Sequence, residues 1–268
     1  MVGQTRYDYQ DESAIVTGST RGIGRGIAAA LADHDANVVV VSRTEEDVIE
    51  TADELNELGD GRAVGITADV GDPNDIETLV STAIDEFGTI DLLVNNAAVW
   101  PMEENLVEAS LMDWEHTIDV NVKSQYYASQ LVAQHMIHND IEGNIINITS
   151  QTGDRRTGGR GIYGISNTAI NGLTWRMAHD LAEFGIRVNA VSTDVTETSQ
   201  LRYEAGLEAE NDPDRTTDDV LNEWGETCPI GRLGQPKDLA NGVLFLASDT
   251  ASYVVGTILR ISGGGNLQ

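Results

Sequence analysis

Basic side chains are scarce in this 268-residue chain, which has 16 lysines and arginines against 44 acidic residues and a formal net charge of -28. Such a surface repels phosphates, and this excludes nucleic acid as a partner. Cys228 is the one cysteine, so an intramolecular disulfide and a cysteine-built zinc site are also excluded. Aromatic residues make up only 5 %, which leaves aliphatic side chains to form the core.

Long apolar runs are missing as well. The longest aliphatic run, Val38 to Val41, is far shorter than the roughly 18 residues that a membrane-spanning helix needs. The opening MVGQTRYDYQDES has no apolar signal segment. We therefore expect a soluble, cytoplasmic protein without a membrane partner.

Lysine is even rarer than arginine, with Lys123 and Lys237 the two lysines beside 14 arginines. A very acidic, lysine-poor composition resembles that of proteins from salt-in halophiles. Multimolar salt shortens the Debye length to about 3 Å or less, so the repulsion among these charges is screened there. The composition favours a halophilic protein, and an ordinary acidic cytosolic protein is the alternative.

Short β-branched runs alternate with longer helical patterns along the whole chain, as in βαβ units with a parallel sheet. The expected strands are Ser13 to Thr17, Asn37 to Ser42, Arg62 to Thr67, Asp91 to Val94, Gly143 to Thr149, Arg187 to Val191 and Thr257 to Ile261. The expected helices are Ile23 to Asp33, Glu45 to Leu58, Pro73 to Phe87, Met112 to Ile137, Tyr163 to Phe184 and Pro236 to Ala247. This pattern predicts one doubly wound α/β domain over residues 1–268, with a seven-stranded parallel sheet and helices on both faces.

One stretch lacks this regular pattern. Residues from Thr196 to Gly234 are rich in charge, include NDPDRTTDD, and separate the sixth strand from the last helix. A long polar excursion in that place is typical of a lid or binding loop. We expect a lid-like segment over about 196–234.

The first strand runs into TGSTRGIGRGIA, with Gly18, Gly22 and Gly24 where strand becomes helix. Glycines there let the backbone approach a pyrophosphate, whose charge then lies at the helix N-terminus. The loop therefore predicts a Rossmann fold that binds a dinucleotide, although a purely structural turn has the same pattern.

Further motifs follow in a fixed order, and together they resemble the short-chain dehydrogenase/reductase family over about residues 8 to 265. After the glycine loop come Asp69-Val70, Asn95-Asn96-Ala97-Ala98 after the fourth strand, Asn121, Ser150, Tyr163 and the closing segment PIGRLGQPKDLANGVLFLASDTASYVVGTILRISGGG. The pattern is most similar to 3-oxoacyl-thioester and acetoacetyl-CoA reductases, and sugar and polyol dehydrogenases look much alike at this level.

The resemblance implies roles for individual residues. Ser150 is expected to bind the carbonyl oxygen, Tyr163 to give or take its proton, and Asn121 to hold a water in the proton relay. The implied cofactor contacts are Gly18, Thr20, Arg21, Gly22, Ile23, Gly24, Ser42, Arg43, Asp69, Val70, Asn95, Ala97, Tyr163, Asn167 and Thr198. The five histidines have no ligand spacing, so no metal site is expected.

Cofactor choice can be argued from charge. A carboxylate at the end of the second strand would bind the ribose of NAD and repel a 2'-phosphate. That strand ends here in Val41-Ser42-Arg43, and Arg21 in the glycine loop adds a second cation. We therefore expect NADP(H), although both arginines could also be solvated loop residues.

The fourth member of the family's catalytic set does not match. The family has Tyr-x-x-x-Lys, and this chain has Asn167 in place of the lysine. A cation about 4 Å away supplies about 4 kcal/mol at an effective dielectric of 20, which brings the pKa of a phenol from about 10 to about 7. Its loss costs on the order of 10³-fold in rate unless another group substitutes. Reduction is expected to suffer less, because a neutral phenol already donates a proton.

Two other positions depart from the family, and one cluster of arginines is unusual. Thr193-Asp194 stands where the family has Pro-Gly, and Ala98 replaces the last glycine of NNAG. Arg155, Arg156 and Arg160 precede Tyr163. These arginines could bind an anionic substrate, with Arg155 and Arg160 as the candidates, or replace the missing cation, or simply pair with surface acids.

We therefore expect NADPH-dependent reduction of a carbonyl, with a 3-oxoacyl thioester as the first candidate and a sugar or polyol as the alternative. A catalytically impaired NADP-binding homologue that acts as an oligomer partner or sensor is the competing hypothesis. The resemblance also implies a homotetramer, or at least a dimer, built on the helices at 112–137 and 163–184.

Overall fold

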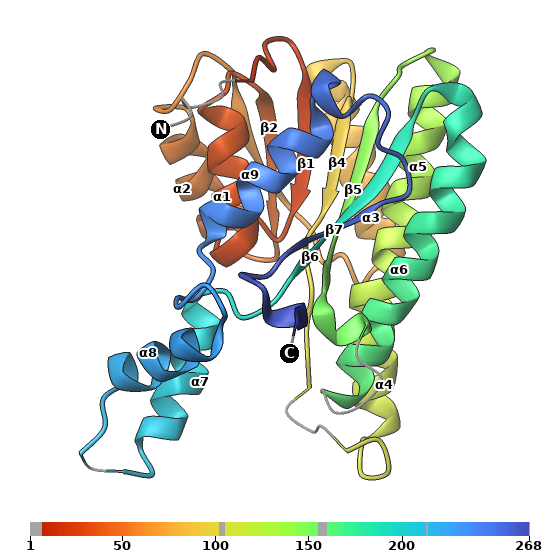
Figure 1. The fold of residues 1–268 in the computed structure, drawn as a ribbon. Helices are drawn as coiled ribbons and strands as arrows, with labels where there is room; N and C mark the ends of the chain where they lie inside the picture. The colour runs from red at the N-terminus through yellow and green to blue at the C-terminus, as the bar shows by residue number, and fades with distance from the viewer. Residues whose placement is uncertain (1–6, 102–104, 155–159, 213, 268) are drawn as a thin grey trace.

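The computed structural model describes residues 7–101, 105–154, 160–212 and 214–267. Its centre is a seven-stranded sheet in the order β3-β2-β1-β4-β5-β6-β7, with every neighbouring pair parallel (Figure 1). The strands are β1 (Ser13–Thr17), β2 (Asn37–Ser42), β3 (Ala63–Thr67), β4 (Leu92–Asn95), β5 (Asn144–Ser150), β6 (Arg187–Thr193) and β7 (Ile258–Ile261). The predicted doubly wound Rossmann fold is therefore confirmed.

Helices cover both faces of the sheet, as the near-continuous apolar strands require. One face carries α1 (Gly22–Ala32), α2 (Glu45–Leu55) and α9 (Pro236–Ala247), and the other carries α3 (Pro73–Phe87), α5 (Ser124–His138) and α6 (Gly161–Leu181). Each face has its own buried aliphatic cluster, around Ile27 and Val40 on the first and around Leu93 and Val132 on the second. No helix in the described ranges is long and apolar enough to cross a membrane.

The helix expected at Met112 to Ile137 is present as one unbroken run, but it is not α-helical throughout. The structure has α4 (Leu111–Ile118), a π-helical turn η1 (Asp119–Lys123) and then α5. A π-turn inserts one extra residue into a helix and is frequent at functional sites. This turn carries Asn121.

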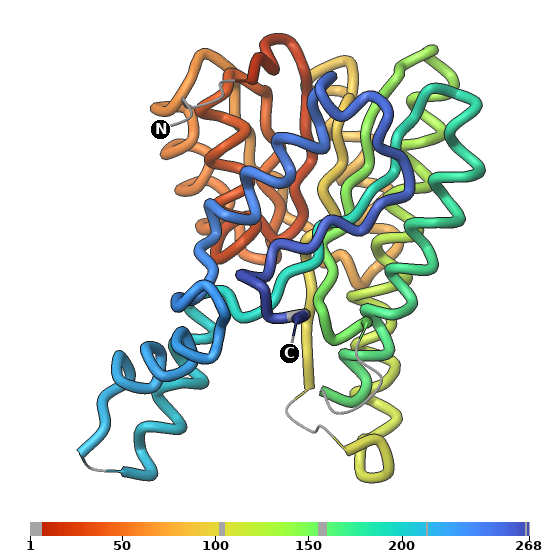
Figure 2. The backbone as a smooth tube through the Cα atoms, viewed as in Figure 1, coloured from red at the N-terminus to blue at the C-terminus, as the bar shows by residue number. Residues whose placement is uncertain are grey.

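The segment at 196–234 is more regular than its sequence indicated. It contains α7 (Ser199–Ala209) and α8 (Thr217–Thr227), which pack on each other through Ala205, Val220 and Leu221. In Figure 2 this pair of helices extends from the body of the molecule beside the carboxyl ends of the strands. Thr198 caps α7, and a capping box of Thr216 and Asp219 begins α8.

A group of acidic side chains lies at the amino ends of the strands, where β1 begins. The pKa of Glu12 is raised to about 7 by burial first and then by the nearby carboxylates of Asp91, Asp249 and Asp8, against the opposing charge of Arg187. The folded protein therefore holds a proton on Glu12 between pH 4.5 and 7 that the unfolded chain releases. Stability from this group is fully present below about pH 4.5 and is lost as pH rises through about 7.

We therefore expect Glu12→Gln to stabilise the protein at pH 8 and to leave stability at pH 4 nearly unchanged. The gain is about 1–2 kcal/mol, since one pKa unit corresponds to about 1.4 kcal/mol and partial exposure screens part of it. Urea unfolding at constant salt measures it, with the exposed Glu50→Gln as the control. An equal pH dependence in both variants would contradict this account of Glu12.

Candidate active site

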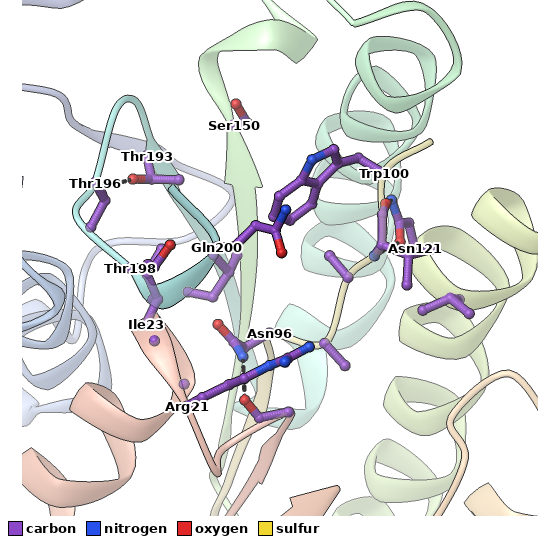
Figure 3. Close-up of a pocket in the computed structure, with 18 of the residues that line it drawn as sticks. Arg21, Ile23, Asn96, Trp100, Asn121, Ser150, Thr193, Thr196, Thr198 and Gln200 are labelled. Atoms are coloured by element: carbon purple, nitrogen blue, oxygen red, sulfur yellow. Dashed lines mark hydrogen bonds between the residues drawn. The ribbon is translucent and has the colours of Figure 1, made fainter. Parts of the chain in front are cut away.

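A cavity of about 690 Å³ lies at the carboxyl ends of the strands, where the chain changes direction between β1 and β4. Ligands bind at this switch point in open α/β sheets. The structure brings most of the expected site residues to its walls: Gly18, Thr20, Arg21, Gly22, Ile23, Gly24, Ser42, Arg43, Asp69, Val70, Ala97, Asn121, Ser150, Arg160, Tyr163, Asn167 and Thr198. In Figure 3 the Trp100 ring lies between Ser150 and Asn121, while Arg21 extends from the glycine loop near Asn96.

Two of the expected residues are not among them. Asn95 is 1 % exposed, and its amide donates to Ser129 Oγ and Asn147 Oδ1, both at 2.9 Å. Its side chain therefore ties β4 to its neighbours, and the adjacent Asn96 lines the cavity instead. Arg155 lies outside the described residues.

The glycine loop is packed too tightly for larger residues. A Cβ on Gly24 would lie 2.3 Å from the carbonyl oxygen of Gly18, and Gly18 itself has a φ of +65°. Ser19 fixes the loop to the sheet, because its Oγ donates to the carbonyl of Val16 at 2.7 Å and accepts from the N–H of Val41 at 2.9 Å. The backbone therefore turns sharply into α1, and at Gly18, Gly22 and Gly24 no side chain separates the main chain from the cavity.

The N-terminus of α1 fits the pyrophosphate of a dinucleotide. Its N-cap residue, Arg21, makes no side-chain capping bond, and no acidic residue lies in the first turn. By contrast, the Asp72 side chain caps α3. Uncapped N–H groups at the positive end of a helix dipole are donors suited to an anion.

The end of β2 forms the opposite wall of the cofactor region. Arg43 lines it together with Arg21 and Ser42, as the sequence predicted. Asp47, in the first turn of α2, also reaches the wall, and the sequence analysis missed it. Two arginines and one aspartate therefore line the part of the cavity where the cofactor is expected.

Ser150 ends β5, and Tyr163 lies in the first turn of α6, so both face the same part of the cavity. Burial raises the pKa of the Tyr163 hydroxyl above its usual value of 10, although hydrogen bonds from Asn167 and Ser150 and the charge of Arg160 lower it in part. Tyr163 is therefore a neutral phenol at physiological pH. Such a group donates a proton more readily than it accepts one.

Asn167 lies one helical turn after Tyr163 and is 2 % exposed. Its Nδ2 donates to the main-chain carbonyl of Tyr163 at 2.9 Å, and its Oδ1 accepts from Thr149 Oγ1 at 3.1 Å. The amide thus packs into the site where a lysine would bring charge. It positions the helix but supplies no cation.

The π-turn fixes Asn121 next to the loop after β4. Its Oδ1 accepts from the N–H of Val99, and its Nδ2 donates to the carbonyl of Val99, both at 2.8 Å. Nδ2 also donates to Ser166 Oγ at 3.1 Å. Both N–H groups of the amide are thereby engaged, while Oδ1 can accept one further hydrogen bond. The expected role of Asn121 in holding a water of the proton relay stays a prediction.

The other departures from the family pattern also lie at the cavity. Thr193, Asp194 and Ala98 line it, and Thr193 Oγ1 is 2.7 Å from Thr196 Oγ1. Lys123, in contrast, pairs with Asp119 at 2.7 Å on the helix surface and is not among the lining residues. No cluster of metal-ligating side chains exists in the part of the chain that the structure describes.

Sequence reasoning missed the side chains that close the cavity beside Tyr163. Trp100 follows β4, and its ring centroid lies 5.9 Å from that of Tyr163. Glu204, on α7, accepts from Trp100 Nε1 at 3.1 Å and from Arg160 Nη2 at 3.2 Å. A tryptophan two positions after the NNAA motif in an aromatic-poor chain was a usable signal, whereas nothing in the sequence singled out Glu204.

Comparison with known proteins agrees with this arrangement. The family model described as "Enoyl-(Acyl carrier protein) reductase" matches residues 18–266. Dehydrogenase/reductase SDR family member 4 of Caenorhabditis elegans is 35 % identical over 96 % of this chain and 95 % of its own length. The 3-oxoacyl-(acyl-carrier-protein) reductase FabG of Vibrio cholerae is 34 % identical over 94 % and 96 %.

Among solved structures, L-sorbose reductase from Gluconobacter frateurii, complexed with NADPH and L-sorbose, has a TM-score of 0.92. It is 26 % identical to this chain, and the match covers 97 % of this chain and 98 % of that one. The family model and the relatives at 34–35 % identity extend over nearly the whole sequence. This chain therefore belongs to the short-chain dehydrogenase/reductase family of oxidoreductases.

Proposed function

We propose that this protein reduces a carbonyl compound with NADPH, and that a 3-oxoacyl thioester such as acetoacetyl-CoA is its substrate. The observation that carries the proposal is a single cavity in which Ser150 and a neutral Tyr163 face the same space as Arg21 and Arg43. The first pair suits carbonyl chemistry, and the second suits a phosphorylated dinucleotide.

In this proposal NADPH, when bound, supplies the hydride that the carbonyl carbon receives. The Ser150 hydroxyl holds and polarises the carbonyl oxygen, and the Tyr163 hydroxyl donates its proton to that oxygen as negative charge develops there. The raised pKa of Tyr163 keeps the proton in place until the carbonyl takes it. Trp100 covers the Tyr163 ring and limits water on that side.

The thioester is supported by the similarity to the Vibrio cholerae reductase, and the sugar alternative by the similarity to L-sorbose reductase. In this proposal the helices α7 and α8 form a lid that closes over the substrate. The lid is supported by Gln200, Leu201 and Glu204 of α7, which line the cavity. Initial rates with NADPH and either acetoacetyl-CoA or L-sorbose distinguish the two substrates. A kcat/KM in favour of L-sorbose would replace the thioester proposal with the sugar one.

The salt conditions, the cellular location and the oligomeric state are proposed from the composition and from exposed aromatic side chains. The net charge of -28 supports a halophilic protein, so assays belong in multimolar KCl, and the single cysteine supports the proposed cytoplasmic location. Tyr126 on α5 and Trp175 on α6 are 45 % and 55 % exposed, which supports assembly of a homotetramer through these helices.

Preference for NADPH is tested by Arg43→Ala. A hydrogen bond from a guanidinium to a phosphate contributes about 1.5–3 kcal/mol, so we expect KM for NADPH to rise about 10- to 100-fold. KM for NADH, which has no 2'-phosphate, should change little. Arg62→Ala is the matched control, because Arg62 is an exposed arginine paired with Glu86 at 2.9 Å outside the cavity. Equal effects on both cofactors would contradict the role of Arg43.

A further inference from the structure

Three side chains from distant parts of the sequence meet beside Tyr163, and we call them the Glu204 cluster: Trp100, Arg160 and Glu204. Each carboxylate oxygen of Glu204 accepts one hydrogen bond, Oε1 from Trp100 and Oε2 from Arg160. The Glu204 side chain is only 17 % exposed and lines the cavity. The cluster thus joins the loop after β4, the start of α6 and the segment at 196–234.

Arg160 is held firmly in this cluster. It is the N-cap residue of α6 and has a φ of +56°, a conformation that a non-glycine residue keeps only where its surroundings fix it. Its guanidinium carbon lies 6.0 Å from the centroid of the Trp100 ring. Because α6 carries Tyr163 in its first turn, this cation is fixed near the reacting end of the cavity.

A fixed guanidinium near a reacting carbonyl would ordinarily bind the carboxylate of an oxo acid. Here the carboxylate of Glu204 already occupies that place. Asp194, which follows Thr193 at the end of β6, also lines this end of the cavity, and its Oδ2 lies against Gly265. A substrate with a carboxylate next to its carbonyl would therefore meet acidic groups and an arginine that is already paired.

We propose that Glu204 is a specificity-determining residue that admits carbonyl compounds without charge beside the carbonyl, such as esters and thioesters, and rejects oxo acids. The inference rests on the proposed reductase function. It adds that the enzyme selects its substrate by the absence of a negative charge near the carbonyl. Selection acts by repulsion of the wrong substrate, which needs no extra contact with the right one.

Ethyl acetoacetate and acetoacetate test this selection, because both contain the acetoacetyl group, which ends in a neutral ester in the first and in a charged carboxylate in the second. The quantity measured is the ratio of kcat/KM for acetoacetate to that for ethyl acetoacetate, with NADPH. Glu204→Gln keeps the size of the side chain, removes its charge and leaves Arg160 free to pair with the substrate. We expect the ratio to rise about 10²-fold, as removal of like-charge repulsion predicts.

The controls separate local charge from net charge. Glu208→Gln makes the same change one turn later on α7, where Glu208 pairs with Arg215 at 3.2 Å on the surface, and it should leave the ratio unchanged. Adding Arg160→Gln to Glu204→Gln should remove the gain. A wild type that reduces acetoacetate as well as its ester, or an unchanged ratio in Glu204→Gln, overturns the proposal.

A binding measurement tests the role of Glu204 even in the absence of catalytic turnover. If the wild type reduces neither of these compounds nor acetoacetyl-CoA, the reductase proposal fails, and calorimetric titration of acetoacetate into protein saturated with NADP still measures the selection. Glu204→Gln should then bind acetoacetate at least about tenfold more tightly than the wild type. Equal affinity contradicts charge selection by Glu204.

Discussion

Asn167→Lys is expected to raise the rate of alcohol oxidation at pH 7 by about 10²- to 10³-fold. Oxidation needs Tyr163 to accept a proton, and in the native protein burial raises the pKa of its hydroxyl above 10. An ammonium group about 4 Å from the phenol contributes about 4 kcal/mol at an effective dielectric of 20, which corresponds to this rate factor. The rate is measured with NADP and 3-hydroxybutyryl-CoA.

The pH dependence of the two reaction directions tests the same role of charge beside Tyr163. A raised phenol pKa means that wild-type oxidation increases with pH up to at least 10, whereas reduction varies little from pH 6 to 8, because Tyr163 stays protonated there. Asn167→Lys should move the rise in oxidation to lower pH. Asn167→Met has nearly the same length as lysine without its charge, and it should show neither effect. Equal gains in both variants would mean that side-chain shape, and not charge, limits the native enzyme.

Tyr163→Phe is expected to lower kcat for reduction by about 10²- to 10⁴-fold, the contribution usual for general acid catalysis by a positioned side chain. Phenylalanine keeps the ring that contacts Trp100 and removes only the hydroxyl. KM for NADPH should change much less than kcat, because Arg21 and Arg43, which we expect to bind the nucleotide, remain in place.

Tyr127→Phe is the matched control for this loss. Tyr127, on α5, donates its hydroxyl to Glu77 on α3, outside the cavity. The substitution removes a tyrosine hydroxyl, as Tyr163→Phe does, but at a position outside the cavity. Reductase activity should therefore stay at the wild-type level. A Tyr163→Phe variant that retains most of its activity would assign proton donation to another group.

The strands were predictable because their residues carry the information locally. Val38 to Val41 and Ser13 to Thr17 are buried on both faces of a parallel sheet, so their continuous β-branched and apolar pattern is what the fold requires. Thr198 and the pair Thr216 and Asp219 are local signals of the same kind. They mark the starts of α7 and α8, which the charge-rich composition of 196–234 obscured.

The remaining differences depend on contacts between distant residues. The π-turn at Asp119–Lys123 places Asn121 against the main chain of Val99, and nothing in a helical periodicity reveals that contact. Asn95 matched a motif, yet its amide turns into the sheet toward Asn147. The contact of Glu204 with Arg160 spans 44 positions in sequence, so only the folded chain shows that this arginine already has a partner.

The most direct test of the central claim is the initial rate of NADPH oxidation with acetoacetyl-CoA in multimolar KCl, measured for the wild type and Tyr163→Phe. We predict that the wild type turns over, that NADPH is used in preference to NADH, and that Tyr163→Phe falls to near background. A wild type no faster than Tyr163→Phe with either cofactor would contradict the assignment of this cavity as a carbonyl reductase site.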